Sequence, residues 1–221
     1  MIIAIDGTTG SGKSTISKAL AQKIGFAYIR TGSCYRAIAL KILKEKVDYS
    51  NINEIKKLLS STQIINKFDG KHVVVTMDGT DVSDKINTPE ISNFVSKISS
   101  IHEVREYVRK LQQNSKKTCE NIIMEGRDIG SVVFPNADLK VFIDCPIDVR
   151  AQRRVNQFKA NNNSVSFEEA KKAIEIRDYD DTHRKESPLV RLPEAFYLDT
   201  SKFDIDGCVN ELVKQIKKLQ K

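Results

Sequence analysis

The stretch AIDGTTGSGKST, residues 4–15, stands close to the start of the chain and closes with a glycine, a lysine and a serine. From Gly7 to Ser14 it matches the pattern G-x-x-x-x-G-K-[ST]. An apolar, strand-like run precedes this motif, and a helix-like pattern reaching about Ile24 follows it. A glycine-rich loop between a strand and a helix, closed by lysine and serine, predicts a phosphate-binding loop.

Glycines in such a loop let the backbone wrap around an anion, and the N-terminus of the following helix adds its dipole. We expect Lys13 to reach the β- and γ-phosphates of a nucleoside triphosphate and the Ser14 hydroxyl to bind Mg²⁺. The predicted phosphate-binding residues are Gly7, Thr8, Thr9, Gly10, Ser11, Gly12, Lys13, Ser14 and Thr15. GTPases, ATPase motors and small-molecule kinases share this motif, so it leaves the acceptor open. The sequence lacks the N-K-x-D element of Ras-type GTPases, which disfavours that class.

Short apolar runs alternate with helix-like stretches along the chain. The runs lie at residues 2–5, 26–29, 122–124, 139–143 and 195–198. This alternation predicts an α/β fold with a central five-stranded parallel sheet flanked by helices. Ligands of such sheets bind beyond the C-terminal ends of the strands, where this sequence places polar residues.

The pattern changes between about residues 46 and 115. FDGKHVVVTMDGTDVS predicts an antiparallel hairpin with Asp78-Gly79 or Asp69-Gly70 as its turn signal, between helical segments at about 51–61 and 88–117. Residues 205–219 predict an amphipathic helix whose apolar face is core. We predict one chain, residues 1–221, with a core of 1–30 and 116–221, an inserted region of 31–115 and a short lid of 150–165. The segment ANNNS (160–164) is predicted to be a mobile loop tip within that lid.

The net charge of +7 (36 basic against 29 acidic residues) and the pI of about 9.1 are compatible with anionic ligands. The lysines are spread as on solvated helix faces, so we expect small-molecule phosphates and no nucleic acid. The 4 cysteines and 3 histidines are scattered, which predicts reduced thiols and no zinc-type site. No apolar run approaches the ~20 residues of a membrane span, and the start lacks the features of a signal peptide. We therefore expect a cytoplasmic protein.

Arginines, by contrast, gather beside the predicted crevice. RTGSCYRA (30–37) and EGRDIG (125–130) each place an arginine after a predicted strand, namely Arg36 and Arg127. Two arginines facing one crevice suggest a second phosphate site, although either one alone is compatible with a structural ion pair. The stretch IRDYDDTHR (176–184) offers Asp178 and, on one face of a predicted helix at i, i+4 and i+7, three further charged residues. They are Arg177, Asp181 and Arg184, and a salt-bridged surface helix is the alternative reading.

A third arginine group lies in DVRAQRRVNQFKANN (148–162). Arg150, Arg153 and Arg154 fall on one or two turns of a predicted helix, where like charges repel unless an anion is present. We interpret them as lid arginines that close over the triphosphate and exclude water. A plain basic helix face is the alternative.

These segments together resemble the bacterial cytidylate kinases, members of the nucleoside monophosphate kinases. The resemblance runs from IDGTTGSGKST through TGSCYR, VREYV, EGRDIGSVVFPNADLKVFID, RAQRR and IRDYDDTHRKESPL to LDTS. It implies reversible, Mg²⁺-dependent transfer of the γ-phosphoryl group of ATP to CMP or dCMP, by a monomer. It also implies that the inserted region binds the monophosphate and that the three lid arginines match the family's R-x-x-R-R pattern.

The resemblance also implies roles for individual residues. Lys13, Arg127, Arg184 and the lid arginines would be catalytic, and Glu125 would contact Mg²⁺ through water. Ser96, Arg105 and Asp128 would read the cytosine, since a carboxylate accepts from its exocyclic amine. The implied CMP-binding residues are Thr31, Arg36, Ser96, Arg105, Arg127, Asp128, Arg177, Asp181 and Arg184.

Three positions depart from the family pattern. Arg30 stands where the family usually has Asp, Glu125 where it usually has Asp, and Asp180 where Arg is expected. Two alternatives remain open at this point: a kinase for UMP or for several monophosphates, and a nucleotide-binding protein without turnover. The carboxylate of Asp128 argues against uracil, and retention of Lys13, Ser14 and the lid arginines argues against a mere binder.

Overall fold

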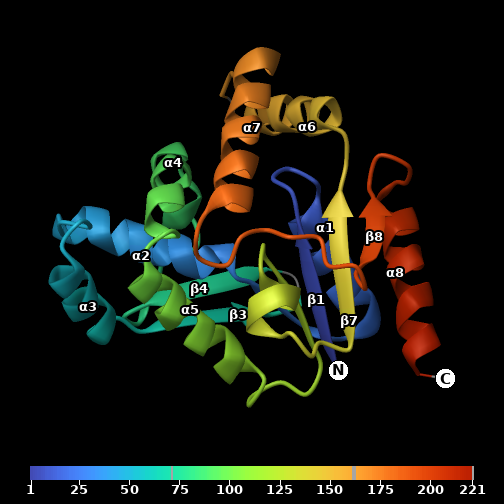
Figure 1. Ribbon diagram of the computed structural model, residues 1–221, viewed down its shortest axis with the longest axis horizontal. Coiled ribbons are helices and arrows are strands. Elements are labelled where there is room, and N and C mark those ends of the chain that lie inside the picture. Colours follow the sequence, from blue (N-terminus) through green and yellow to red (C-terminus); the bar gives the residue numbers. More distant parts are fainter. Residues whose placement is uncertain (71, 161–162, 221) are drawn as a thin grey trace. The chain divides into compact units, whose positions relative to one another are not determined.

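Figure 1 shows the computed structural model, which describes residues 1–70, 72–160 and 163–220. Its main sheet has the strand order β2-β6-β1-β7-β8. The strands are β1 (Ile2–Gly7), β2 (Ala27–Arg30), β6 (Ile122–Glu125), β7 (Leu139–Asp144) and β8 (Phe196–Asp199). The predicted α/β fold with a five-stranded parallel sheet is therefore confirmed.

Parallel pairing brings the chemically important strand ends to one edge. Strand β1 pairs with β7, with Gly7 opposite Ile143, and β7 pairs with β8, with Asp144 opposite Asp199. All six residues of β1 are buried, which explains why the strand reads as a continuous apolar run with no alternation. The phosphate-binding loop thus begins at the same sheet edge at which β7 and β8 end.

The chain consists of two compact units: Met1–Ile24 with Glu125–Lys221, and Gly25–Met124. In the first unit, α1 (Lys13–Ile24) packs against β1 and against α8 (Ile205–Leu219), the predicted C-terminal helix. Helices α6 (Ile147–Ala160) and α7 (Phe167–His183) pack against each other. Ser166 caps α7 through a capping box with Glu169. Of the loop tip predicted at 160–164, residues 161–162 lie outside the described residues.

The second unit combines helices with a small antiparallel sheet. The sheet contains β3 (Ile64–Phe68), β4 (Val73–Met77) and β5 (Thr80–Asp81). The helices are α2 (Gly32–Glu45), α3 (Ile52–Ser60), η1 (Lys85–Asn87), α4 (Pro89–Ile98) and α5 (His102–Ser115). One apolar cluster, which includes Ile38, Ile55 and Val108, holds these elements together.

Two sequence expectations for this unit can be compared with its structure. The Asp78-Gly79 turn is confirmed, because both residues adopt positive φ (51° and 78°) between β4 and β5. The single helical segment predicted at about 88–117 is two helices. Ile101 takes an extended backbone (φ −77°, ψ 125°) and starts α5 anew. The apolar spacing continued across this break, which is why periodicity alone did not reveal it.

Gly7, the first residue of the phosphate-binding loop, packs closely against β7, and this packing can be tested. A Cβ at Gly7 would lie 1.9 Å from the carbonyl oxygen of Ile143, inside van der Waals contact. We expect Gly7→Ala to lower the melting temperature by roughly 3–10 °C, because β1 and β7 must move apart. Differential scanning calorimetry measures this shift. Gly32→Ala is the control, since nothing lies within 4 Å of a Cβ there. Equal melting temperatures for the two variants would contradict the packing.

Candidate active site

The loop between β1 and α1 has the backbone shape that an anion site needs. Gly7, Gly10 and Gly12 all have positive φ, at 150°, 76° and 92°. Turns of this kind direct successive N–H groups to one side, and the N-terminus of α1 adds a partial positive charge. The nine predicted phosphate-binding residues form this one continuous loop and the first turn of α1.

Lys13 is the cation of this loop, and it is buried. The side chain folds back so that Nζ donates to the carbonyl oxygen of Thr8 and lies 3.5 Å from Oγ of Ser11. Burial, followed by the nearby charge of Arg127, lowers the pKa of Lys13 to about 7. An amine held in a desolvated loop interacts strongly with an incoming phosphate, which in turn favours its charged form.

Ser14 and Glu125 meet at the end of the loop. The Ser14 hydroxyl donates to Oε1 of Glu125 across 2.7 Å. A hydroxyl and a carboxylate are hard oxygen donors, and Mg²⁺ is usually bound by one or two such protein groups together with substrate phosphates and water. These two residues therefore fit a magnesium ion. Among the described residues, no group of three or more His, Cys, Asp or Glu side chains is placed to bind a metal ion.

The ends of β7 and β8 supply the walls of the loop. Oγ1 of Thr8 donates to Asp144 across 2.5 Å, and Oγ1 of Thr200 donates to the carbonyl oxygen of Ser11 across 2.9 Å. Sequence reasoning noticed the polar strand ends but missed Thr200 as part of the site. Its position directly after Asp199, the last residue of β8, was the available signal, because parallel strands end at one edge.

A second group in the first unit is built around one carboxylate. The side chain of Asp181 is 3% exposed, and Nε of Arg127 donates to its Oδ2 across 2.8 Å. Arg177 approaches the same oxygen at 3.3 Å, and Arg184 approaches Oδ1 at 3.4 Å. Burial alone would raise the pKa of Asp181, but the three guanidinium groups outweigh it and hold the pKa below its usual value. Four of the implied CMP-binding residues are thus brought together: Arg127, Arg177, Asp181 and Arg184.

This cluster also contacts the phosphate-binding loop. Arg127 donates from its second terminal nitrogen to Oγ1 of Thr9 across 3.1 Å. The backbone N–H of Thr9 donates to Oδ1 of Asp178 across 2.8 Å. Asp178 was not among the predicted site residues, although it lies in the quoted IRDYDDTHR stretch. The loop and the arginine cluster therefore share one hydrogen-bond network.

The three predicted lid arginines of α6 have separate partners. Arg150 bonds the carbonyl oxygens of Cys145 and Thr9 and also donates to Asp178. The other two differ from it. Arg153 donates to the hydroxyl and to the carbonyl oxygen of Thr200, both at 2.9 Å, while Arg154 lies over the ring of Phe158. The expected repulsion among like charges is relieved because each of the three guanidinium groups has its own protein acceptor, which for Arg154 is Oε1 of Gln157 at 3.1 Å.

The remaining predicted residues belong to the second unit, except Asp128. Arg36 donates to the carbonyl oxygen of Ile86 at 3.0 Å and to Oγ of Ser92 at 2.9 Å. Arg105 is buried, donates to the carbonyl oxygen of Ser99 and lies 5.7 Å from the centre of the Tyr35 ring. Ser96 is half-buried on α4, and Thr31 is buried just before α2. Asp128 belongs to the first unit and is 7% exposed.

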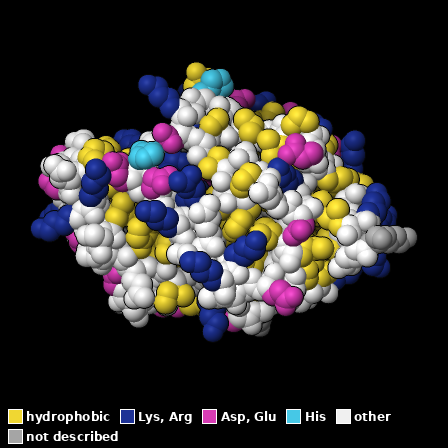
Figure 2. Space-filling model, turned by 60° about the horizontal axis from the view of Figure 1, so that its bottom comes forward, with side chains coloured by type: hydrophobic (Ala, Val, Ile, Leu, Met, Phe, Trp, Pro, Cys, Tyr) yellow, Lys and Arg dark blue, Asp and Glu magenta, His cyan; other side chains and the backbone are white. Residues whose placement is uncertain are grey.

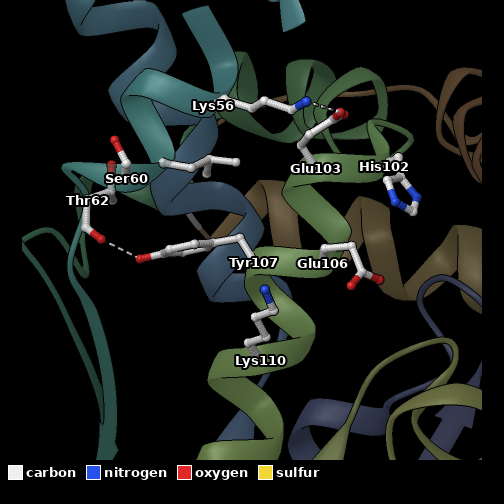
Figure 3. Close-up of a pocket in the computed structure, with 9 residues that line it drawn as sticks. Lys56, Ser60, Thr62, His102, Glu103, Glu106, Tyr107 and Lys110 are labelled. Atoms are coloured by element: carbon white, nitrogen blue, oxygen red, sulfur yellow. Dashed lines mark hydrogen bonds and ion pairs between the residues drawn. The ribbon is translucent and has the colours of Figure 1, made fainter. Parts of the chain in front are cut away.

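The second unit also contains an open hollow of about 540 Å³ between α3 and α5 (Figure 3). The Tyr107 hydroxyl donates to the carbonyl oxygen of Thr62 across 2.5 Å, and Lys56 pairs with Glu103 at 3.7 Å. None of the nine residues that line this hollow is among the predicted site residues. We therefore keep it apart from the candidate active site.

The surface bears on the alternative of nucleic-acid binding. Figure 2 shows lysine and arginine side chains interspersed with acidic, apolar and neutral groups on the face it presents. Several lysines pair with acidic side chains, for example Lys214 with Glu211 and Lys140 with Glu194, both at 2.6 Å.

In the part of the chain that the structure describes, no helix is long and apolar enough to cross a membrane.

The parallel sheet, the glycine-rich loop and the buried lysine define a P-loop protein of the kinase class. Residues 3–218 match the family model described as cytidylate kinase. The chain belongs to the cytidylate kinase family.

Curated relatives extend this match over nearly the whole chain. A cytidylate kinase of Clostridium botulinum (strain Loch Maree / Type A3) is 41% identical over 216 residues, which cover 98% of this chain and 97% of that protein. A cytidylate kinase of Fusobacterium nucleatum subsp. nucleatum is 40% identical over 220 residues, covering 100% and 99%.

Among solved structures, TT1252 from Thermus thermophilus is similar in fold, with a TM-score of 0.51 and 16% identity over 99% of this chain and 96% of that one. An uncharacterized protein from Eubacterium ventriosum ATCC 27560 has a TM-score of 0.54 and 13% identity, covering 99% and 98%. At such low identity these two structures bear on the fold alone.

The Asp181 cluster yields a second test. Asp181→Asn removes the charge that three guanidinium groups share, so we expect a loss of about 3 kcal/mol in the free energy of unfolding. Urea denaturation followed by circular dichroism measures it. Asp180→Asn, one residue away and exposed, is the matched control and should change stability by less than about 0.5 kcal/mol. Equal losses in both variants would mean that other groups hold the arginines.

Proposed function

We propose that the chain catalyses reversible transfer of the γ-phosphoryl group of ATP to CMP or dCMP, giving ADP and CDP or dCDP. The observation that carries this is the shared network of the phosphate-binding loop and the Asp181 arginine cluster, joined at Thr9. In this proposal the loop and the cluster are two cationic phosphate sites of different construction within the first unit. Family membership supports CMP as the acceptor, because the curated relatives are named cytidylate kinases.

In the proposed reaction, an oxygen of the acceptor's phosphate attacks the γ-phosphorus, and the bond to the β–γ bridging oxygen breaks. Lys13 and the guanidinium groups stabilise the charge on the transferring group, while the loop and the arginine cluster hold donor and acceptor in line. No general base is required, since the attacking oxygen is already ionised. Arg36, Arg127 and Arg184 would bind the acceptor's phosphate, with Arg177 and Asp181 around its phosphate and ribose.

The proposed donor is ATP with Mg²⁺. Ser14 would bind the ion directly and Glu125 through water, consistent with the hard oxygen donors that meet there. A magnesium ion held by these two residues would supply Lewis-acid stabilisation of the phosphate charge. Glu125 is one methylene longer than the aspartate usual in the family. Its hydrogen bond with the Ser14 hydroxyl supports this proposed role for the longer side chain.

The proposed base readers are Asp128, Ser96 and Arg105. A carboxylate at Asp128 would accept from the exocyclic amine of cytosine and repel the carbonyl of uracil. In this proposal residues 31–115 bind the monophosphate, and residues 150–165 form the lid of a monomer. Arg150 donates to the carbonyl oxygen of Thr9 within the phosphate loop, and Arg153 donates to Thr200, whose hydroxyl donates to the carbonyl oxygen of Ser11.

The test of this function is ADP production from Mg·ATP with CMP, dCMP, UMP, AMP and GMP in turn. We expect CMP and dCMP to dominate, and Lys13→Ala to lower kcat by at least about 100-fold because the γ-phosphate loses its cation. Lys23→Ala, on the same helix but exposed, is the control and should retain kcat. Equal rates with UMP would favour a broader pyrimidine kinase. Nucleotide binding without ADP production would favour a binding protein.

The lowered pKa of Lys13 gives a prediction on pH. With a pKa of about 7 in the unliganded protein, Lys13 is partly neutral at neutral pH, and a bound diphosphate raises the pKa. Binding therefore takes up a proton, and affinity for ADP falls as pH rises above 7, by up to about tenfold per unit.

Isothermal titration calorimetry of ADP between pH 7 and 9, in two buffers of different ionisation enthalpy, measures this uptake. Lys13→Arg, whose charge does not titrate in this range, should abolish both the uptake and the slope. An unchanged slope in Lys13→Arg would assign the titration to another group.

A further inference from the structure

Asp6 is the last residue of β1 before the phosphate-binding loop, and its buried carboxylate faces another segment. Oδ1 accepts the backbone N–H of Ile129 at 2.9 Å, and Oδ2 accepts that of Gly130 at 2.8 Å. The residue is 7% exposed. Both carboxylate oxygens thus bind the turn that begins at Asp128.

That turn has an unusual backbone and depends on outside support. Residues 129–133 form one turn of π-helix, η2, with Asp128 immediately before it at φ −141° and ψ 22°. The carbonyl oxygen of Asp128 accepts the N–H groups of Val132 and Val133 at 2.9 and 3.1 Å. A single π turn is seldom stable alone and is frequent at functional sites.

Strand β1 holds this segment at two adjacent residues. On one side of Asp128, the N–H of Gly126 donates to the carbonyl oxygen of Ile5 at 2.9 Å. On the other side, the Asp6 carboxylate binds the two N–H groups of η2. Hydrogen bonds to β1 therefore hold the chain on both sides of Asp128. Of these bonds, those to the Asp6 carboxylate are the ones that a side chain of β1 accepts.

Gly130 allows the carboxylate to approach closely. A Cβ there would lie 3.3 Å from Cγ of Lys140 and 3.5 Å from Oδ2 of Asp6. Lys140 itself pairs with Glu194 at 2.6 Å. There is thus little space between Gly130, Lys140 and the Asp6 carboxylate.

A buried carboxylate at this place is costly. Burial raises the pKa of Asp6 to about 6, although the N–H groups of Gly130 and Ile129 act against it. Asparagine would occupy the same volume without charge, but it presents one oxygen where two N–H groups require acceptors. A carboxylate is needed at this position because the two N–H groups, of Ile129 and Gly130, each require an acceptor oxygen.

We propose that Asp6 is a positioning residue for recognition of the acceptor's base, holding the turn that presents Asp128 and joining it to the phosphate loop through the Asp6–Gly7 peptide bond. The inference rests on the proposed function, in which Asp128 reads cytosine. Asp6 does not touch the substrate in this proposal. It acts through the backbone of Ile129 and Gly130.

The experiment compares Asp6→Asn with wild type in steady-state kinetics with CMP, UMP and ATP as varied substrates. We expect KM for CMP to rise about tenfold, because one N–H of η2 loses its acceptor and the turn shifts. The preference for CMP over UMP in kcat/KM should fall, while KM for ATP stays within about twofold. Asp138→Asn is the control: it also accepts a backbone N–H of β1, from Ile2 at 2.6 Å, but at the opposite end of the strand. It should leave all three parameters unchanged.

A double-variant cycle separates positioning from direct effects. If Asp6 acts through Asp128, then Asp6→Asn combined with Asp128→Asn should lose less CMP preference than the two single losses add up to. Full additivity would overturn the proposal, as would a rise in KM for ATP that equals or exceeds the rise for CMP. Should Asp6→Asn be too unstable to assay, Gly130→Ala disturbs the same turn more gently and must show the same selective loss.

Wild-type activity on CMP, measured in the same plates, tests the proposed function separately. If wild type phosphorylates CMP and Asp6→Asn behaves like wild type, only the inference fails. If wild type does not phosphorylate CMP, the proposed function fails, and the inference that depends on it fails with it.

Discussion

The buried carboxylate of Asp181 is the interaction on which the candidate site depends most. Three guanidinium groups lie at 2.8, 3.3 and 3.4 Å from its two oxygens, in a place where its side chain is 3% exposed. Without a central negative charge, these cations would repel one another and could not be gathered before a substrate arrives. Asp181 is therefore the internal anion that holds Arg127, Arg177 and Arg184 together.

The same principle extends to the phosphate-binding loop. Asp178 accepts from the N–H of Thr9 and from Arg150, and Asp144 accepts from Thr8. Asp144 stands at the end of β7 and Asp178 on α7, and each accepts a hydrogen bond from a group of the loop. The loop is thereby shaped in advance, so less ordering is required when a nucleotide binds. Asp6 supports η2 in a comparable way, with two carboxylate oxygens for the N–H groups of Ile129 and Gly130.

The sequence predicted much of this correctly, and its errors were specific. The five strands, the Asp78-Gly79 turn and the C-terminal helix follow from local patterns, and the structure confirms them. The break at Ile101 was missed because apolar spacing continued across it. The separate partners of Arg150 and Arg153 were also missed, since two of their acceptors, the backbone carbonyl oxygens of Cys145 and Thr200, leave no mark in a sequence. Thr200 was overlooked, and Asp178 was noted on its helix but given no role in the site, for a similar reason: aspartate and threonine are common, and only their neighbours in space make them part of the site.

By itself the sequence determined the fold class and the position of the phosphate-binding loop. Its charged motifs also indicated the class of protein, a kinase. These properties depend on residue type and on spacing along the chain, which a sequence displays directly. Only the tertiary structure decided which carboxylate holds which cation, because Arg127 and Asp181 are 54 residues apart and Thr9 and Asp178 are 169 residues apart. Hydrogen bonds and ion pairs act over a few ångströms in space, so the folded chain alone can determine such partners.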